Sequence, residues 1–226
     1  MPRLHDIGEI RRLLRRDPAW SVYALGDLAP AMFAKATWFT PDLTLVFRDY
    51  GAVILFAMGT GSVREALDAI DGPVHLQVQA AALEVIRGQA HVSSAQRMLR
   101  MVWTGHPPPA GPDASVRLGA RDVEALQRLY ADGQASGESP DFFFPSMVTD
   151  GVFRGVYEGD DLVAAAGTHL VSREEGVASI GNVYTRRDRR GRGLGRRAVS
   201  AALADLAGVE TIGLNVRADN AAAMHL

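Results

Sequence analysis

The chain has 226 residues, and its 24 basic residues nearly balance 26 acidic residues, giving a net charge of −2. Without an overall positive charge, we expect no nucleic-acid partner. The absence of cysteine excludes disulfides, a thiol nucleophile and cysteine-ligated metal, and the scattered histidines lack metal-ligand spacing, so we expect no metal. No apolar run reaches the roughly 18 residues of a membrane span, and the charged N-terminus lacks a signal peptide's apolar core. We therefore expect a cytoplasmic protein without membrane contact.

The first half of the chain alternates helical and extended segments. Apolar residues recur at helical spacing from Ile7 to Leu14, and short apolar runs bounded by turn residues indicate strands. A Gly-Thr-Gly-Ser turn at 59–62 falls between a strand and a helix. The pattern predicts helices at 7–14, 18–28, 63–70 and 81–87, and strands at 43–47, 52–58, 74–78 and 97–103.

A proline-rich segment then divides the chain. Four prolines between His106 and Pro112 cannot continue a sheet or a helix, which indicates a semi-rigid linker. We therefore expect a first domain at 1–105, a linker at 106–113 and a second domain at 114–226. In the second domain the pattern predicts strands at 114–118, 162–171 and 177–185 and helices at 122–130 and 198–207.

The turn between the strand at 177–185 and the helix at 198–207 is the most informative feature. Residues 186–197 contain seven arginines and three glycines. The free N–H groups of a first helical turn and the positive end of the helix dipole attract a phosphate, and the arginines add charge-assisted hydrogen bonds. The alternative is a basic surface turn or a patch that grips nucleic acid. A P-loop is disfavoured because no Gly-Lys-Ser/Thr follows.

The spacing Arg190-x-x-Gly193-x-Gly195, the strand before it and the segment 214–226 after it resemble the GNAT superfamily of N-acetyltransferases, over about residues 115–226. The resemblance implies an α/β fold with a mixed, mostly antiparallel twisted sheet flanked by helices. Because the first half repeats this order without the arginines, we interpret it as a degenerate GNAT-like domain in tandem. The alternative is an unrelated α/β domain.

The resemblance also implies that acetyl-CoA is the cofactor. The turn would hold its pyrophosphate, the strand end would pair with its pantetheine arm, and the N–H of Val183 or of a neighbouring residue would stabilise the oxyanion. The implied cofactor-binding residues are Val183, Tyr184, Thr185, Arg190, Gly191, Arg192, Gly193, Leu194, Gly195, Arg196 and Asn220.

The general base and acid are less determined. Glu138 and His169 are the candidate bases, against the alternatives of a solvated carboxylate and a hydrogen-bonded strand histidine. In the family a tyrosine acid usually follows one residue beyond Leu226, so the domain looks truncated before its last strands. Tyr184 and Tyr157 are the candidate substitutes for that acid. Asn182 either anchors a bulge, faces the acceptor or makes a structural hydrogen bond.

The segment 136–150 is expected to form one wall of the acceptor site. Its three consecutive phenylalanines, from Phe142, either receive the acceptor or fill the core. We predict an N-acetyltransferase that acetylates a primary amine of a small molecule or protein by direct attack in a ternary complex. The alternative is a non-catalytic acyl-CoA-binding sensor or interaction protein, and a nucleic-acid binder with steep salt dependence is a third hypothesis. The sequence leaves a homodimer open.

Overall fold

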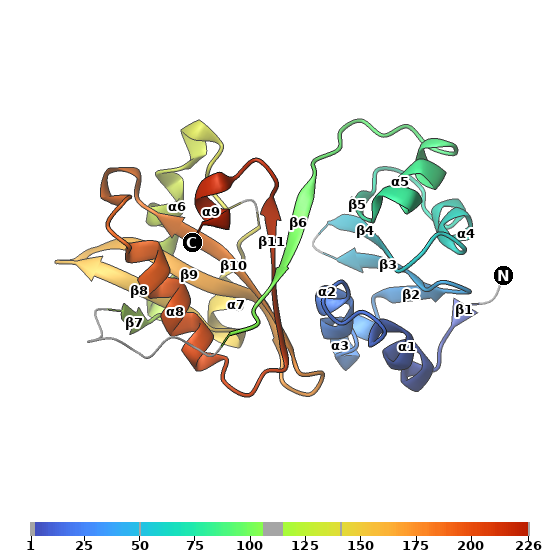
Figure 1. The fold of residues 1–226 in the computed structure, drawn as a ribbon, viewed down its shortest axis with the longest axis horizontal. Helices are drawn as coiled ribbons and strands as arrows, with labels where there is room; N and C mark the ends of the chain where they lie inside the picture. Colours follow the sequence, from blue (N-terminus) through green and yellow to red (C-terminus); the bar gives the residue numbers. More distant parts are fainter. Residues whose placement is uncertain (1–2, 50, 106–114, 141, 226) are drawn as a thin grey trace. The chain divides into compact units, whose positions relative to one another are not determined.

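The computed structural model describes residues 3–49, 51–105, 115–140 and 142–225. The chain forms two compact units, Met1–Arg97 and Met98–Leu226, called here the N-terminal and C-terminal units (Figure 1). Within the described stretches, no helix has the length and apolarity needed to cross a bilayer.

The N-terminal unit contains a five-stranded sheet in the order β1-β2-β3-β4-β5. Its strands pair antiparallel except for β4 and β5, which are parallel and are connected through a helix. The elements in chain order are β1 (Arg3–Leu4), α1 (Ile7–Leu14), α2 (Val22–Gly26), α3 (Pro30–Phe33), β2 (Ala36–Phe39), β3 (Thr44–Asp49), β4 (Ala52–Ala57), α4 (Val63–Asp68), β5 (His75–Gln77) and α5 (Ala80–Arg87).

Local sequence explains how this unit forms. Helix α1 begins after Asp6, whose carboxylate accepts the Glu9 N–H at 2.8 Å and so caps the helix. Its apolar positions Ile10 and Leu14 are fully buried. The buried residues of α4 and α5 pack against those of the sheet and form one cluster. Its members are Phe39, Val46, Leu55 and Ala57 of the strands and Val63, Ala66, Ala82 and Ile86 of the helices.

The C-terminal unit contains a six-stranded sheet in the order β6-β11-β10-β9-β8-β7. Among the described strands of this sheet, only β10 and β11 are parallel. The elements are β6 (Met98–Val102), β7 (Ser115–Arg117), α6 (Val123–Ala131), α7 (Pro145–Asp150), β8 (Phe153–Glu158), β9 (Asp161–Ser172), β10 (Val177–Thr185), α8 (Leu194–Asp205), β11 (Thr211–Arg217) and α9 (Ala221–Met224), with short 3₁₀ turns at Ala120–Asp122, Gln134–Ser136 and Arg187–Arg189.

Helices cover both faces of this second sheet. Adjacent residues of a strand point to opposite faces. On β9, Leu162 packs in the cluster that contains Leu126 of α6, whereas Val163 packs with Leu194 of α8. Helix α8 therefore covers one face and α6 the other.

The position of β6 differs from the sequence expectation. The strand predicted at 97–103 does form, but it pairs antiparallel with β11 in the second sheet and does not complete the first. A strand pattern does not identify its partner, and here β6 pairs with the edge of β11 that faces away from β10. The structure consequently divides the chain between Arg97 and Met98, whereas a first domain of 1–105 was expected. The predicted linker at 106–113 lies outside the described residues.

The two units share one order of elements. Leaving β6 aside, each runs from a short edge strand through helices to three consecutive antiparallel strands, and then through a helix to a parallel strand and a further helix. This confirms the expected α/β class with two mixed, mostly antiparallel sheets flanked by helices.

Candidate cofactor and catalytic site

The parallel strands β10 and β11 pair along only part of their length. Their register runs from Val177 opposite Thr211 to Ile180 opposite Leu214, where the pairing ends. Beyond this point β10 continues to Thr185 beside β9, and β11 continues to Arg217 beside β6. Among the described residues, the end of β10 therefore has no strand partner on its β11 side. The predicted Val183, Tyr184 and Thr185 lie on this segment.

A bulge interrupts β10 in the same segment. Gly181 stands opposite Gly167 and Tyr184 opposite Ala165, so two residues of β10 face one of β9. Asn182 has a φ of 52°, a left-handed conformation that asparagine tolerates better than most residues. The Tyr130 hydroxyl donates to the Asn182 carbonyl at 2.9 Å and holds the bulge in place. A bulge leaves one residue outside the regular ladder, which makes its backbone N–H available to a ligand.

The side chain of Asn182 is buried inside this bulge. Its Nδ2 lies 3.6 Å from the Met147 sulfur, while its Oδ1 has no hydrogen-bond partner among the described residues. The sequence left open whether Asn182 anchors a bulge, faces the acceptor or makes a structural hydrogen bond. In the structure Asn182 is part of the bulge.

The glycine-rich turn ends where α8 begins. Gly191 and Gly193 both have φ of 74°, in the region that favours glycine, and Gly193 is the N-cap of the helix. The first helical hydrogen bond runs from the Arg197 N–H to the Gly193 carbonyl. The N–H groups of Leu194, Gly195 and Arg196 have no backbone acceptor within the described part of the chain. Three donors and the helix dipole thus converge on one point.

The surroundings of the turn leave it open on one side. A Cβ placed on Gly191 or Gly193 would meet no atom within 4 Å, so space for a ligand exists beside both. Leu194 is buried with Val156, Val163 and Ala164, which fixes the start of the helix to the sheet. The predicted cofactor residues from Gly191 to Arg196 therefore lie where an anchored helix start meets open space.

Carboxylates partly neutralise the arginines. The Arg190 guanidinium donates to both oxygens of Glu138, at 2.9 and 3.3 Å, and lies 5.5 Å from the centre of the Tyr184 ring. Arg187 approaches Glu138 at 3.6 Å, and Glu158 lies 2.7 Å from Arg189. Arg192 is 3.7 Å from Glu158. Arg196 and Arg197 have no carboxylate partner among the described residues.

The two candidate bases occupy different surroundings. Hydrogen bonds from Arg190 and Ser136 lower the pKa of Glu138 to about 2, so this carboxylate is a poor base. Burial lowers the pKa of His169 to about 4, which leaves the imidazole neutral at pH 7. The His169 ring lies against Gly181, where a Cβ would be 2.3 Å from Nε2. His169 is therefore beside the bulge, whereas Glu138 belongs to the arginine network.

Asn220 follows β11 at the start of α9. Its Oδ1 accepts the Ala223 N–H at 3.0 Å, so the side chain caps this helix.

The two tyrosines considered as acids are both bound to carboxylates. Tyr184 donates to Asp132 at 2.8 Å and Tyr157 donates to Asp122 at 3.1 Å. Burial and the Asp132 contact raise the pKa of Tyr184 to about 12. Asp132 also accepts the Arg187 N–H at 3.0 Å. It thereby connects the glycine-rich turn within residues 186–197, called here the arginine turn, to the end of α6. Sequence reasoning missed Asp132 because its partners are more than 50 residues away.

The three phenylalanines divide between two environments. Phe143 packs edge-on against Tyr130 and Phe153 in the core. Phe142 is 39% exposed and lies 4.7 Å from the Phe144 ring and 6.1 Å from the His169 ring, measured between ring centres. Phe143 therefore fills the core, whereas Phe142 is exposed beside His169.

Comparison with solved structures shows a shared fold. A Drosophila protein is 13% identical over 99% of this chain and 91% of its own, with a TM-score of 0.71. A GCN5-related N-acetyltransferase from Kribbella flavida is 15% identical over 94% of this chain and 86% of its own, with a TM-score of 0.53. A protein of Novosphingobium aromaticivorans described as GNAT is 27% identical, with a TM-score of 0.49 over 57% of this chain and 55% of its own.

No curated protein matches the chain. Residues 122–226 match the acetyltransferase (GNAT) family. This range begins one residue before α6 and contains β10, the arginine turn and α8. The match includes the motif at Arg190, Gly193 and Gly195, and residues 122–226 accordingly form a domain of the acetyltransferase (GNAT) family.

Proposed function

We propose that the chain is an N-acetyltransferase that transfers the acetyl group of acetyl-CoA to a primary amine of a small molecule or protein. The observation that carries this proposal is the junction of β10 with α8. There, a strand end without a partner on its β11 side leads into a turn with open space beside Gly191 and Gly193, followed by three amides without a backbone acceptor among the described residues. Such a junction offers a pyrophosphate its preferred donors.

Each part of the junction has a separate task in binding acetyl-CoA. The amides from Leu194 to Arg196 and the guanidinium of Arg190 would hold the pyrophosphate, with Arg192 and Arg196 adding positive charge. The main chain from Val183 to Thr185 would pair with the amide groups of the pantetheine arm. Asn220, which caps α9, would keep the start of that helix in place beside the same strand ends.

The bulge would supply the electrostatic part of catalysis. A backbone N–H at Val183 would donate to the thioester carbonyl oxygen and stabilise the negative charge that develops there. The amine nitrogen would attack the carbonyl carbon directly and form the C–N bond. The C–S bond would break as the oxyanion collapses, and CoA would leave as a thiolate that takes a proton from water. The chain has no cysteine to carry the acyl group on a thiol.

His169 is the candidate base that fits the proposal better. Its imidazole lies beside the bulge and next to Phe142, and this position would allow it to accept the amine proton. The exposed ring of Phe142 would contact the acceptor. Glu138 would instead belong to the cofactor side of the site, because its carboxylate accepts a hydrogen bond from Arg190.

A non-catalytic acyl-CoA-binding sensor is the second candidate. It is favoured by the engagement of both Tyr184 and Tyr157 with carboxylates, which occupies their hydroxyl protons. An enzyme must protonate the leaving thiolate, whereas a sensor has no such need.

Thiol release from acetyl-CoA in the presence of a panel of primary amines tests the proposal. Gly193→Asp should abolish release, because it places a negative charge on the pyrophosphate side of α8. Gly208→Asp is the matched control, since Gly208 also has positive φ and an open Cβ direction but follows the other end of α8. Acetyl-CoA binding without release for any amine would favour the sensor. Full activity in folded Gly193→Asp would contradict both candidates.

A further inference from the structure

In the N-terminal unit, the turn that corresponds to the arginine turn is occupied by an aspartate side chain. Residues 59–62 connect β4 to α4, as the arginine turn connects β10 to α8. Here the Gly61 N–H donates to the Asp42 carboxylate at 3.0 Å. A Cβ on Gly59 would lie 2.7 Å from the Asp42 Cβ, and one on Gly61 would lie 2.8 Å from its Oδ2. Both glycines thus make room for a negative charge that disfavours a phosphate.

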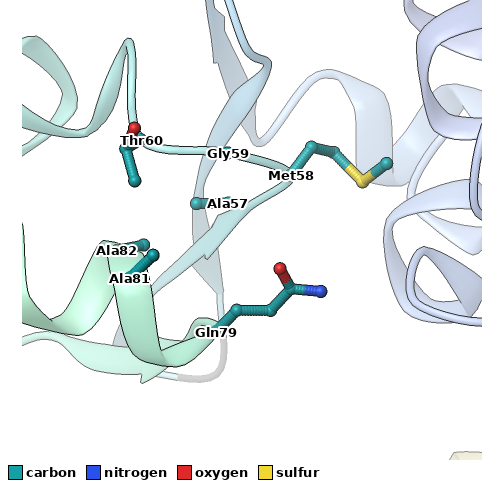
Figure 2. Close-up of a pocket in the computed structure, with 7 residues that line it drawn as sticks. All are labelled: Ala57, Met58, Gly59, Thr60, Gln79, Ala81 and Ala82. Carbon is teal, nitrogen blue, oxygen red and sulfur yellow. The ribbon is translucent and has the colours of Figure 1, made fainter.

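The space beside the end of β4 is also small. Pairing of β4 with β5 ends at Phe56 opposite Gln77. The hollow that follows measures about 20 Å³ and has room for one water. Figure 2 shows its lining, formed by Ala57, Met58, Gly59, Thr60, Gln79, Ala81 and Ala82.

A larger cavity of about 350 Å³ lies in the same unit, within the size range of small-molecule sites. It shares Met58 and Gly59 with the smaller hollow, and Figure 2 shows the Met58 side chain directed away from Ala81 and Ala82. The complete lining is Leu13, Arg16, Pro41, Asp42, Leu43, Met58 and Gly59.

Two opposite charges line this cavity without pairing. Asp42 is held by Gly61, whereas the Arg16 side chain, just beyond the end of α1, has no carboxylate within 4.0 Å among the described residues. Leu43 has a φ of 50°, an unfavourable conformation for leucine. Strained residues of this kind concentrate at ligand-binding sites.

We propose that this cavity binds a small zwitterion with an apolar side chain, of the α-amino-acid class. The guanidinium of Arg16 would take the ligand carboxylate, and the Asp42 oxygens would accept from its ammonium group. Leu13, Leu43 and Met58 would contact the apolar side chain. The proposal does not depend on the activity of the C-terminal unit.

Calorimetric titration of the full chain with L-valine, L-leucine and L-methionine tests this site. At least one should bind with one site per chain. Two analogues of L-leucine each lack one charge: isopentylamine has no carboxylate and 4-methylpentanoate has no ammonium. Each analogue should bind at least about tenfold more weakly than L-leucine, because each loses a charged hydrogen bond. Failure of all three amino acids to bind, or equal binding of isopentylamine, would overturn the proposal.

Substitutions locate the binding within the cavity. Arg16→Gln and Asp42→Asn should each weaken amino-acid binding about tenfold or more, while the new amide at position 42 can still accept from Gly61. Arg12→Gln is the matched control, because Arg12 lies on α1 about one turn before Arg16 and pairs with Glu9, and neither residue lines the cavity. Acetyl-CoA binding should be unchanged in all three variants. Undiminished amino-acid binding by Arg16→Gln and Asp42→Asn would refute the assignment.

Discussion

The buried imidazole of His169 makes the stability of the C-terminal unit depend on pH. The unfolded chain binds a proton at its ordinary pKa of 6.5, whereas the folded protein resists protonation until about pH 4. Stability is therefore fully present above pH 6.5 and is lost as the pH falls toward 4. At pH 5 about 1.5 pKa units of this difference have taken effect, which corresponds to about 2 kcal/mol.

Comparison with His169→Gln isolates this contribution. The wild-type chain alone is insufficient, because burial raises the pKa of Asp27 to about 7, and protonation of Asp27 stabilises the folded state as the pH falls below 7. The free energy of unfolding of both proteins would be measured in urea at pH 8 and pH 5, following NMR signals from β9 and β10. Following these strands avoids assuming that the two units unfold together.

The expected result is that wild-type stability falls by about 2 kcal/mol relative to His169→Gln between these pH values. A relative change below about 0.5 kcal/mol, the usual limit of additivity, would refute the reasoning. It would mean that the imidazole is solvated and titrates near its ordinary pKa.

Three further predictions concern the arginine turn and its counterpart. Glu138→Gln should tighten acetyl-CoA binding by removing the carboxylate that competes for Arg190; unchanged affinity by calorimetry would show that this pair does not oppose binding. Tyr184→Phe should destabilise the C-terminal unit by about 1–2 kcal/mol in urea, because Asp132 loses a hydrogen-bond donor, and a neutral effect would remove Asp132 from the supports of the turn. Gly61→Asp should lower the thermal stability of the N-terminal unit, because its side chain meets Asp42, and should leave acetyl-CoA affinity unchanged; a large loss of affinity would give this unit a cofactor role.

The sequence predicted the local elements well because their signals are local. The strand Val177–Thr185 and the helix Ile7–Leu14 have the expected bounds, since each is set by apolar spacing and a nearby turn or cap. The glycine conformations of the arginine turn follow equally from a short motif. Strands β1, β2 and β8 were missed. For β1 and β2 the reason is their length, because two to four residues give too little periodicity to detect.

Features that depend on distant partners could not be read from the chain. The pairing of β6 with β11 joins segments more than 100 residues apart. The hydrogen bond from Tyr184 to Asp132 and the placement of Asp42 against Gly61 likewise depend on the folded sheets. Glu138 was expected as a solvated carboxylate or a base, and only the folded loop brings it to Arg190.

Calorimetric titration of the chain with acetyl-CoA tests the central claim most directly. The arginine turn predicts saturable binding at one site per chain, because the corresponding turn of the N-terminal unit is occupied by Asp42. This binding should be lost in Gly193→Asp and retained in Gly208→Asp. An absence of binding by the folded wild-type chain, or equal binding by folded Gly193→Asp, would contradict the assignment of the cofactor site.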